Sequence, residues 1–247
     1  MKYGVVTYAR NKDVNIGDSI MSLGVREVYK KMGIKEEDIV NIYYDKNING
    51  NFQYDLEGYD GEYIILPMAM CIDFDTEHPN IFPLPPRIIP VFLGFHTITP
   101  EGWVKFFSDY KHFGPFACRD VKTMELLRKE GLEAYTIGCL SIQSVEKREQ
   151  TRHQNKVYLV DVPQHLRKYI PKEILQNAIE KTHVRYINEF LTGVEAAEEE
   201  LKLTRNILRE YRDYAKLVIT TRLHCALPCI SMGIPTIVVN KERKNRE

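Results

Sequence analysis

The chain has 247 residues, a length that allows one large domain or two small ones. It carries 34 Lys and Arg against 34 Asp and Glu, and 44% of its residues are hydrophobic. This composition is typical of a globular protein and excludes an intrinsically disordered one. It also argues against a dedicated nucleic-acid-binding protein, because such proteins normally carry a basic excess. The longest apolar run, 63–72, is too short to span a membrane and contains a proline.

Two further features concern cellular location. Residues 1–13 contain no apolar segment of signal-peptide length, so the sequence predicts a cytoplasmic protein. The cysteines are odd in number and have no tightly paired spacing, which is typical of reduced thiols rather than of a disulfide framework or a zinc site. They are Cys71, Cys118, Cys139, Cys225 and Cys229.

Strand-like stretches rich in Val, Ile and Tyr alternate with amphipathic helical stretches, which predicts an α/β fold with parallel sheets covered by helices. In the first part of the chain we expect strands at 2–8, 38–44, 62–68, 88–93, 116–119 and 134–138, and helices at 18–32, 102–110 and 121–130. The Asn- and Gly-rich stretch 45–61 and the proline-rich segment 79–86 are expected to be loops.

Residues 144–156 contain almost no apolar side chains and no regular period, which predicts an exposed linker. The alternation then resumes, with strands expected at 157–162, 183–188, 217–220 and 236–239 and helices at 171–181, 194–215 and 223–232. The sequence therefore predicts two doubly wound, Rossmann-like units, 1–148 and 149–247. Their facing strand ends would form a ligand cleft.

The two halves differ in charge. Residues 1–150 hold 17 basic and 22 acidic side chains, a net charge of −5, whereas residues 151–247 hold 17 and 12, a net charge of +5. We therefore expect an anionic ligand on the side of the second unit.

The first candidate for a binding loop is 9–19, which leads from a strand into a helix. Gly17 permits a tight turn, and the start of the following helix favours an anion. Asp18 is suited to cap that helix. The residue types alone favour a capped turn that holds no ligand, because strand-to-helix loops of this kind are common.

Two other strand-to-helix junctions carry cations. Arg119 follows a short apolar strand, where a guanidinium can hold a carboxylate or phosphate at two points; the alternative is a surface arginine paired with an acid. Arg222 and His224 follow the apolar strand 217–220, and both can face one cleft. A permanent cation beside a group that titrates near neutral pH suits an anionic substrate that needs a proton, although a lone histidine can also be structural.

Three segments carry a resemblance to a known family. They are NIGDSIMSLG (15–24), FACRDVKTMELLRKEGLEAYTIGCLS (116–141) and VITTRLHCALPCISMGIPTIVV (218–239). In this order they resemble the polysaccharide pyruvyl transferase family. The resemblance implies two Rossmann-like units of the glycosyltransferase-B type, here with a compact second unit. It also implies transfer of the pyruvyl group of phosphoenolpyruvate to a sugar as a ketal, with no metal and no cofactor.

The resemblance implies roles for individual residues. Arg119 and Arg222 would hold the carboxylate and phosphate of phosphoenolpyruvate, and Lys241 would add a further charge. His224 would be the general acid that protonates the methylene carbon of the donor. The partners would be phosphoenolpyruvate, bound by the second unit, and a sugar or glycan acceptor.

The acceptor side of the cleft would be lined by Asn15, Gly17 and Asp18 from the first unit.

Two features depart from the family pattern. Residues 67–70 (PMAM) stand where many members have a glycine-rich turn, and the charged tail 240–247 stands where a helical extension usually follows.

Alternative functions remain open. Asp73 and Asp75 form an Asp-x-Asp pair of the kind that holds a divalent metal in many nucleotide-sugar glycosyltransferases. Thiol chemistry is a weaker alternative. Cys118 adjoins Arg119 and Cys225 adjoins His224, but adjacent residues on a helix point about 100° apart, so neither pair is automatically catalytic. Cys225 and Cys229 are expected to be small residues of the core. A non-catalytic glycan-binding relative of the same fold is the third.

Overall fold

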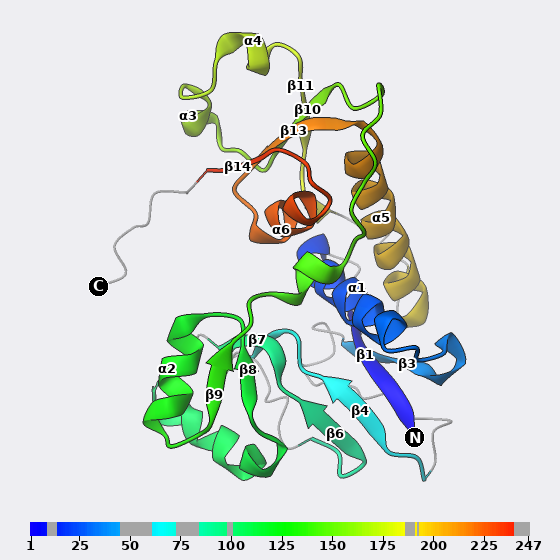
Figure 1. Ribbon diagram of the computed structural model, residues 1–247, viewed down its shortest axis with the longest axis vertical. Coiled ribbons are helices and arrows are strands. Elements are labelled where there is room, and N and C mark those ends of the chain that lie inside the picture. Colours follow the sequence, from blue (N-terminus) through cyan, green and yellow to red (C-terminus); the bar gives the residue numbers. More distant parts are fainter. Residues whose placement is uncertain are drawn as a thin grey trace.

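The computed structural model describes residues 1–8, 14–44, 61–72, 84–97, 101–185, 191 and 193–239, with the backbone alone at 44, 101–106 and 185. Three four-stranded sheets, all of them parallel, are accompanied by helices (Figure 1). This arrangement confirms the α/β class.

The first sheet has the order β3-β1-β4-β6. Its strands are β3 (Ile39–Tyr44), β1 (Lys2–Tyr8), β4 (Ile64–Pro67) and β6 (Ile88–Val91). The last five residues of β1 are all buried, as expected for a strand inside a parallel sheet that is covered on both faces.

The second sheet has the order β5-β7-β8-β9. Its strands are β5 (Cys71–Ile72), β7 (Leu93–Thr97), β8 (Phe116–Cys118) and β9 (Ala134–Thr136). The strand predicted at 88–93 is confirmed as far as Val91, but its continuation to 93 is wrong, because the chain leaves the first sheet at Phe92 and enters the second. The Phe92 side chain is 1% exposed, and its ring lies 4.7 Å from that of Phe116 and 5.5 Å from that of Phe95. Burial of this aromatic ring favours the break between the strands.

The third sheet has the order β11-β10-β13-β14. Its strands are β11 (Ala178–Lys181), β10 (Lys156–Val160), β13 (Ala215–Thr220) and β14 (Thr236–Val238). The helix predicted at 171–181 is wrong. Only α4 (Lys172–Leu175) forms, after the equally short α3 (Gln164–Arg167), and residues 178–181 pair with β10 instead. Parallel pairing with β10 thus overrides the local helical pattern.

Four longer α-helices of the described chain cover the sheets, and two of them end shortly before a glycine with positive φ. Gly33 and Gly131 adopt φ angles of +75°, each directly after the C-cap residue of α1 or α2. One side of α5 is buried at Ala197, Leu201 and Thr204, and the burial continues to Tyr211. The helices are α1 (Ile16–Lys31), α2 (Val121–Lys129), α5 (Gly193–Tyr214) and α6 (Leu223–Ser231).

The helix predicted at 102–110 is a 3₁₀ helix, η2 (Glu101–Phe113), rather than an α-helix. Phe107, Tyr110 and Phe113 follow one another at intervals of three, the period that places side chains on one side of a 3₁₀ helix. All three join the apolar cluster around Phe92. The other 3₁₀ segments are η1 (Glu36–Asp38) and η3 (Leu140–Gln143).

The strands of the first two sheets precede residue 137, and those of the third follow residue 155. Between them, 144–155 has no helix or strand and is mostly exposed, as predicted. Several contacts join these parts of the chain, among them one helix packing and one strand pairing. Ile20 and Leu23 of α1 pack against Leu201 and Leu208 of α5, and β2 (Val14–Asn15) pairs antiparallel with β12 (Val184–Arg185). Of the strand predicted at 183–188, residues 186–188 lie outside the described residues.

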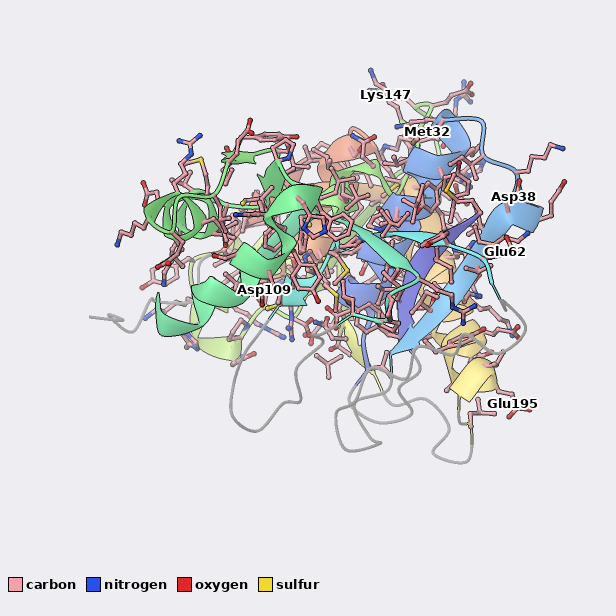
Figure 2. The ribbon with its side chains drawn as sticks, turned by 90° about the horizontal axis from the view of Figure 1, so that it is seen from below. Met32, Asp38, Glu62, Asp109, Lys147 and Glu195 are labelled. Atoms are coloured by element: carbon pink, nitrogen blue, oxygen red, sulfur yellow. The ribbon has the colours of Figure 1, made fainter. Side chains whose placement is uncertain are left out.

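The outer surface is charged, and side chains such as Asp38, Lys147 and Glu195 project from its periphery (Figure 2). Among the described residues, no helix combines the length and apolar character needed to cross a bilayer.

Gly24 brings α1 into contact with η3. A Cβ atom at this position would lie 2.2 Å from the carbonyl oxygen of Leu140, far inside van der Waals contact. We expect Gly24→Ala to lower the free energy of unfolding by about 2 kcal/mol, because overpacking outweighs the roughly 1 kcal/mol gained in helix propensity. Urea denaturation measures the change. Glu27→Ala on the outer side of the same helix is the control, and an equal effect of both variants would contradict the close-contact explanation.

Candidate active site

The start of α1 differs from the prediction. Asn15, in extended conformation, caps the helix and accepts a hydrogen bond from the Gly17 amide at 3.2 Å. The prediction that Asp18 is the cap is therefore wrong, because the helix begins two residues earlier than expected. Asp18 lies in the first turn, where its carboxylate interacts favourably with the helix dipole.

Gly17 places this helix start directly against His224, the second residue of α6. A Cβ atom on Gly17 would lie 2.7 Å from Nδ1 and 3.0 Å from Cβ of His224. Only glycine leaves room for the imidazole at this contact. The predicted Gly17 and His224 are thus neighbours, and Figure 1 shows the beginning of α1 close to α6.

Arg119 reaches the same place from the second sheet. It follows β8, and its amide donates to the carbonyl of Phe95 in β7. One terminal guanidinium nitrogen, Nη1, lies 3.5 Å from Nε2 of His224. Asp120, which follows Arg119, caps α2 by accepting from the Thr123 amide at 2.8 Å. The structure therefore brings together a cation and an imidazole that are 105 residues apart in the sequence.

Arg222 is held by an acid from the end of β10. Its Nε donates to Oδ2 of Asp161 at 2.9 Å. Asp161 has a φ of +53°, and burial favours its neutral form. Hydrogen bonds from Thr182 and the His183 amide, together with Arg222, outweigh that effect and lower the pKa of Asp161. Asp161 accepts from Nε, and no hydrogen bond within the described residues engages the two terminal nitrogens of Arg222.

Cys139, which precedes η3, also belongs to this cluster, and sequence reasoning did not connect it with His224. It is 7% exposed and accepts a hydrogen bond from Oγ of Ser141 at 3.1 Å. Burial alone would raise the pKa of the Cys139 thiol, but hydrogen bonding to His224 and Ser141 lowers it to about 7. The distance in sequence between Cys139 and His224 explains why no local pattern revealed the pair.

This thiol gives a pH-dependent prediction. A lowered pKa means that the thiolate forms as the pH rises through about 7, so alkylation of Cys139 by iodoacetamide should accelerate between pH 6 and 8. In His224→Gln the lost contact leaves burial dominant, and the midpoint should move to higher pH. Peptide mass spectrometry separates Cys139 from the exposed Cys71. An unchanged midpoint in the variant would contradict the contact.

His96 is the second residue, after Cys139, that the structure adds to the cluster around His224 and that no sequence pattern indicated. It lies near the carboxyl end of β7, half-buried, and its Nδ1 is buried without a hydrogen-bond partner in the described chain. Burial and the nearby Arg119 lower the pKa of His96 to about 4, with a smaller contribution from His224. His96 is therefore uncharged at neutral pH.

Three of the other cysteines are core residues, whereas Cys71 is exposed. Cys118, Cys225 and Cys229 are 0% exposed, and burial raises the pKa of Cys118 to about 12. These observations confirm the prediction that Cys225 and Cys229 belong to the core. The predicted Lys241 and the Asp73–Asp75 pair lie outside the described residues, as does the first part of the loop 9–19.

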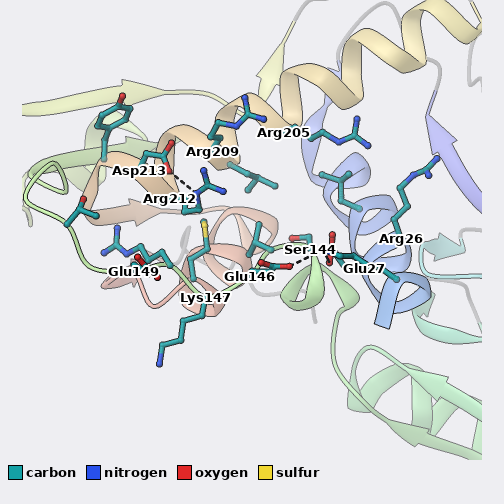
Figure 3. A pocket seen from close by; sticks show the side chains of 18 of the residues that line it. Arg26, Glu27, Ser144, Glu146, Lys147, Glu149, Arg205, Arg209, Arg212 and Asp213 are labelled. Atoms are coloured by element: carbon teal, nitrogen blue, oxygen red, sulfur yellow. Dashed lines mark hydrogen bonds and ion pairs between the residues drawn. The ribbon is translucent and has the colours of Figure 1, made fainter. Parts of the chain in front are cut away.

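A separate groove of about 1020 Å³ lies between α1, the segment 144–154 and α5 (Figure 3). Its described lining includes arginines from both helices, Arg26 and Arg205, but none of the predicted site residues. Ion pairs neutralise part of its charge: Arg26 with Glu36, Lys30 with Glu146, and Arg212 with Asp213. The groove is therefore distinct from the cluster around His224.

The sequence matches the model of the polysaccharide pyruvyl transferase family over residues 94–242, more than half of the chain. The chain belongs to the polysaccharide pyruvyl transferase family. This match confirms the family predicted from the sequence segments. It contains Arg119, Arg222 and His224, whereas the segment 15–24 lies before it. The family name implies a transferase with a sugar or glycan acceptor.

One solved structure resembles this pyruvyl transferase family member along almost its whole length. It is that of a functionally uncharacterized protein from Klebsiella pneumoniae subsp. pneumoniae NTUH-K2044, with a TM-score of 0.50 and 12% sequence identity. The similarity covers 98% of this chain and 85% of that chain. At this identity it concerns the fold alone. No curated protein matches the chain.

Proposed function

We propose that this member of the family transfers the pyruvyl group of phosphoenolpyruvate to a sugar of a polysaccharide or glycan precursor, forming a ketal. The observation that carries the proposal is the 3.5 Å approach of Arg119 Nη1 to His224 Nε2. It puts a permanent cation, able to hold an anionic donor, beside a group able to deliver a proton to that donor.

In this proposal Arg119 and Arg222 hold the carboxylate and phosphate of the donor, and Lys241 adds a further charge. Asp161 orients Arg222 through Nε. No side chain in the described part of the chain caps α6, so the first amides of this helix can also face an anion. The electrostatic requirement of a small, highly charged donor is thereby met by fixed positive groups.

His224 acts as the general acid. It transfers a proton to the methylene carbon, and the adjoining carbon becomes cationic enough for a sugar hydroxyl to attack it. A second hydroxyl then forms the second C–O bond as the bond to the phosphate oxygen breaks. Of the two hydroxyl protons released, one restores His224 and the other leaves with the phosphate. The reaction needs neither a cofactor nor a redox partner.

The acceptor is placed on the side of Asn15, Gly17 and Asp18, at the start of α1. We assign residues 1–148 to an acceptor-side unit and 149–247 to a compact donor-side unit, in a glycosyltransferase-B type arrangement. The strands of the first two sheets all precede residue 137 and those of the third all follow residue 155, which supports this division. The charges of the two halves support it as well, because the basic half carries Arg222 and His224.

The test has two arms. Phosphoenolpyruvate should raise the melting temperature of the protein. When phosphoenolpyruvate is supplied together with members of a panel of galactosides, glucosides and N-acetylmannosamine carriers, phosphate should be released. Arg119→Lys and Arg222→Lys should weaken donor binding about tenfold, because an ammonium cannot reproduce a two-point grip. The absence of any thermal shift with phosphoenolpyruvate would refute the donor assignment.

A further inference from the structure

His96 and Arg119 are neighbours on adjacent parallel strands. The register pairs Phe95 of β7 with Cys118 of β8, so the residues that follow, His96 and Arg119, stand side by side. The side chains of Phe95 and Cys118 point into the apolar core, and alternation turns those of His96 and Arg119 to the opposite face. An anion held by Arg119 at this edge therefore lies within reach of His96.

The two ring nitrogens of His96 have different surroundings. Nδ1 is sealed from solvent and has no hydrogen-bond partner in the described chain. A buried N–H without an acceptor is costly, so Nδ1 is best accommodated as the unprotonated nitrogen. The proton of the neutral ring then resides on Nε2. With Nδ1 sealed, Nε2 is the ring nitrogen left for a ligand, and it presents a donor.

The charges around the ring oppose its protonation. A positive His96 would stand beside Arg119 and near His224, and it would place a second N–H at the sealed Nδ1. Asp120 at the start of α2 and Asp18 at the start of α1 act in the opposite direction but do not outweigh burial and Arg119. The ring thus remains uncharged over the range in which an ordinary histidine titrates.

We propose that His96 is an uncharged hydrogen-bond donor that binds, through Nε2–H, an oxygen of the same anion that Arg119 holds. The identity of that anion as phosphoenolpyruvate rests on the proposed function. A neutral donor adds an oriented hydrogen bond without adding charge. His224 therefore remains the group that can supply a proton, and His96 fixes the anion against it.

Nitrogen-15 NMR of labelled histidine tests the tautomer without any need for activity. From pH 5.5 to 8, His96 should remain neutral with its proton on Nε2, and inorganic phosphate should shift the Nε2 resonance. A ring protonated at Nδ1, or an Nε2 resonance unmoved by both phosphate and phosphoenolpyruvate, would overturn the proposal. A response to phosphate but not to phosphoenolpyruvate would support His96 as an anion ligand while refuting the proposed donor.

Binding measurements provide the second readout. His96→Leu should raise the dissociation constant for inorganic phosphate about tenfold or more, since hydrogen bonds to charged groups are among the stronger ones. His96→Gln, which retains an N–H donor, should recover part of the affinity. His112→Leu, the same substitution at an exposed histidine of η2, is the matched control. Equal affinity of the wild type and a folded His96→Leu variant would also overturn the proposal.

Discussion

Replacing His224 with glutamine should reduce the rate of pyruvyl transfer by about 10²–10⁴, while the affinity for phosphoenolpyruvate changes little. Glutamine has a similar reach and keeps polar atoms near Arg119, but it cannot deliver a proton to carbon. Arg119 and Arg222 remain to hold the donor. The measurements are phosphate release under saturating donor and the thermal shift that the donor produces.

The outcome separates two roles that a histidine beside an arginine can have. If His224 only positions the donor, His224→Gln should raise the Michaelis constant for phosphoenolpyruvate and leave kcat nearly unchanged. If it is the general acid, kcat should fall and the thermal shift should persist. Loss of donor affinity with an unchanged kcat would contradict the general-acid role. Arg119→Lys serves for comparison, because its main expected effect is on donor binding.

The part of the site that local patterns reveal is the part built at strand-to-helix junctions. Arg119 and the Arg222–His224 pair each follow a short buried strand, and the carboxyl ends of parallel strands are where ligands bind in such folds. The sequence could therefore indicate which residues face a cleft. It could not indicate which of them meet, because the contact between Arg119 and His224 depends on how two different sheets are placed.

Cys139 and His96 illustrate the same limit of local sequence patterns, because no pattern indicated that either residue belongs to the site. Cys139 precedes a 3₁₀ turn, and His96 belongs to β7, most of which lies beyond the strand predicted at 88–93. Cys139 falls in the segment 116–141 that resembles the family, but nothing in that segment points to His224, and His96 falls in none of the three segments. Their partners His224 and Arg119 lie more than 20 residues away. The fold was predictable where the apolar period was long, as in α5. It was mispredicted where tertiary pairing decided the outcome, as at 178–181.

Replacing Gly17 with alanine should impair catalysis with only a moderate loss of stability. The new methyl group would overlap the His224 ring, 2.7 Å from Nδ1, and Cβ of His224 at 3.0 Å is too close to the backbone to turn away freely. The imidazole must move away from α1, and its distance from Arg119 must change. A displacement of about 1 Å at a reacting group can cost roughly 100-fold in rate, and we expect a loss of that order.

Gly4→Ala is the matched control for this prediction. A Cβ atom at Gly4 in β1 would meet Cδ1 of Leu66 at 2.8 Å, a similar degree of crowding, but its described neighbours Leu66, Ile64 and Ile42 belong to the first sheet. Gly4→Ala should therefore lower the melting temperature and leave kcat unchanged, whereas Gly17→Ala should lower kcat at temperatures where it is fully folded. Equal kcat values for the two variants would show that contact between α1 and α6 does not set the position of His224. The His224–Arg119 pair would then be positioned from the side of Arg119 and Cys139 alone.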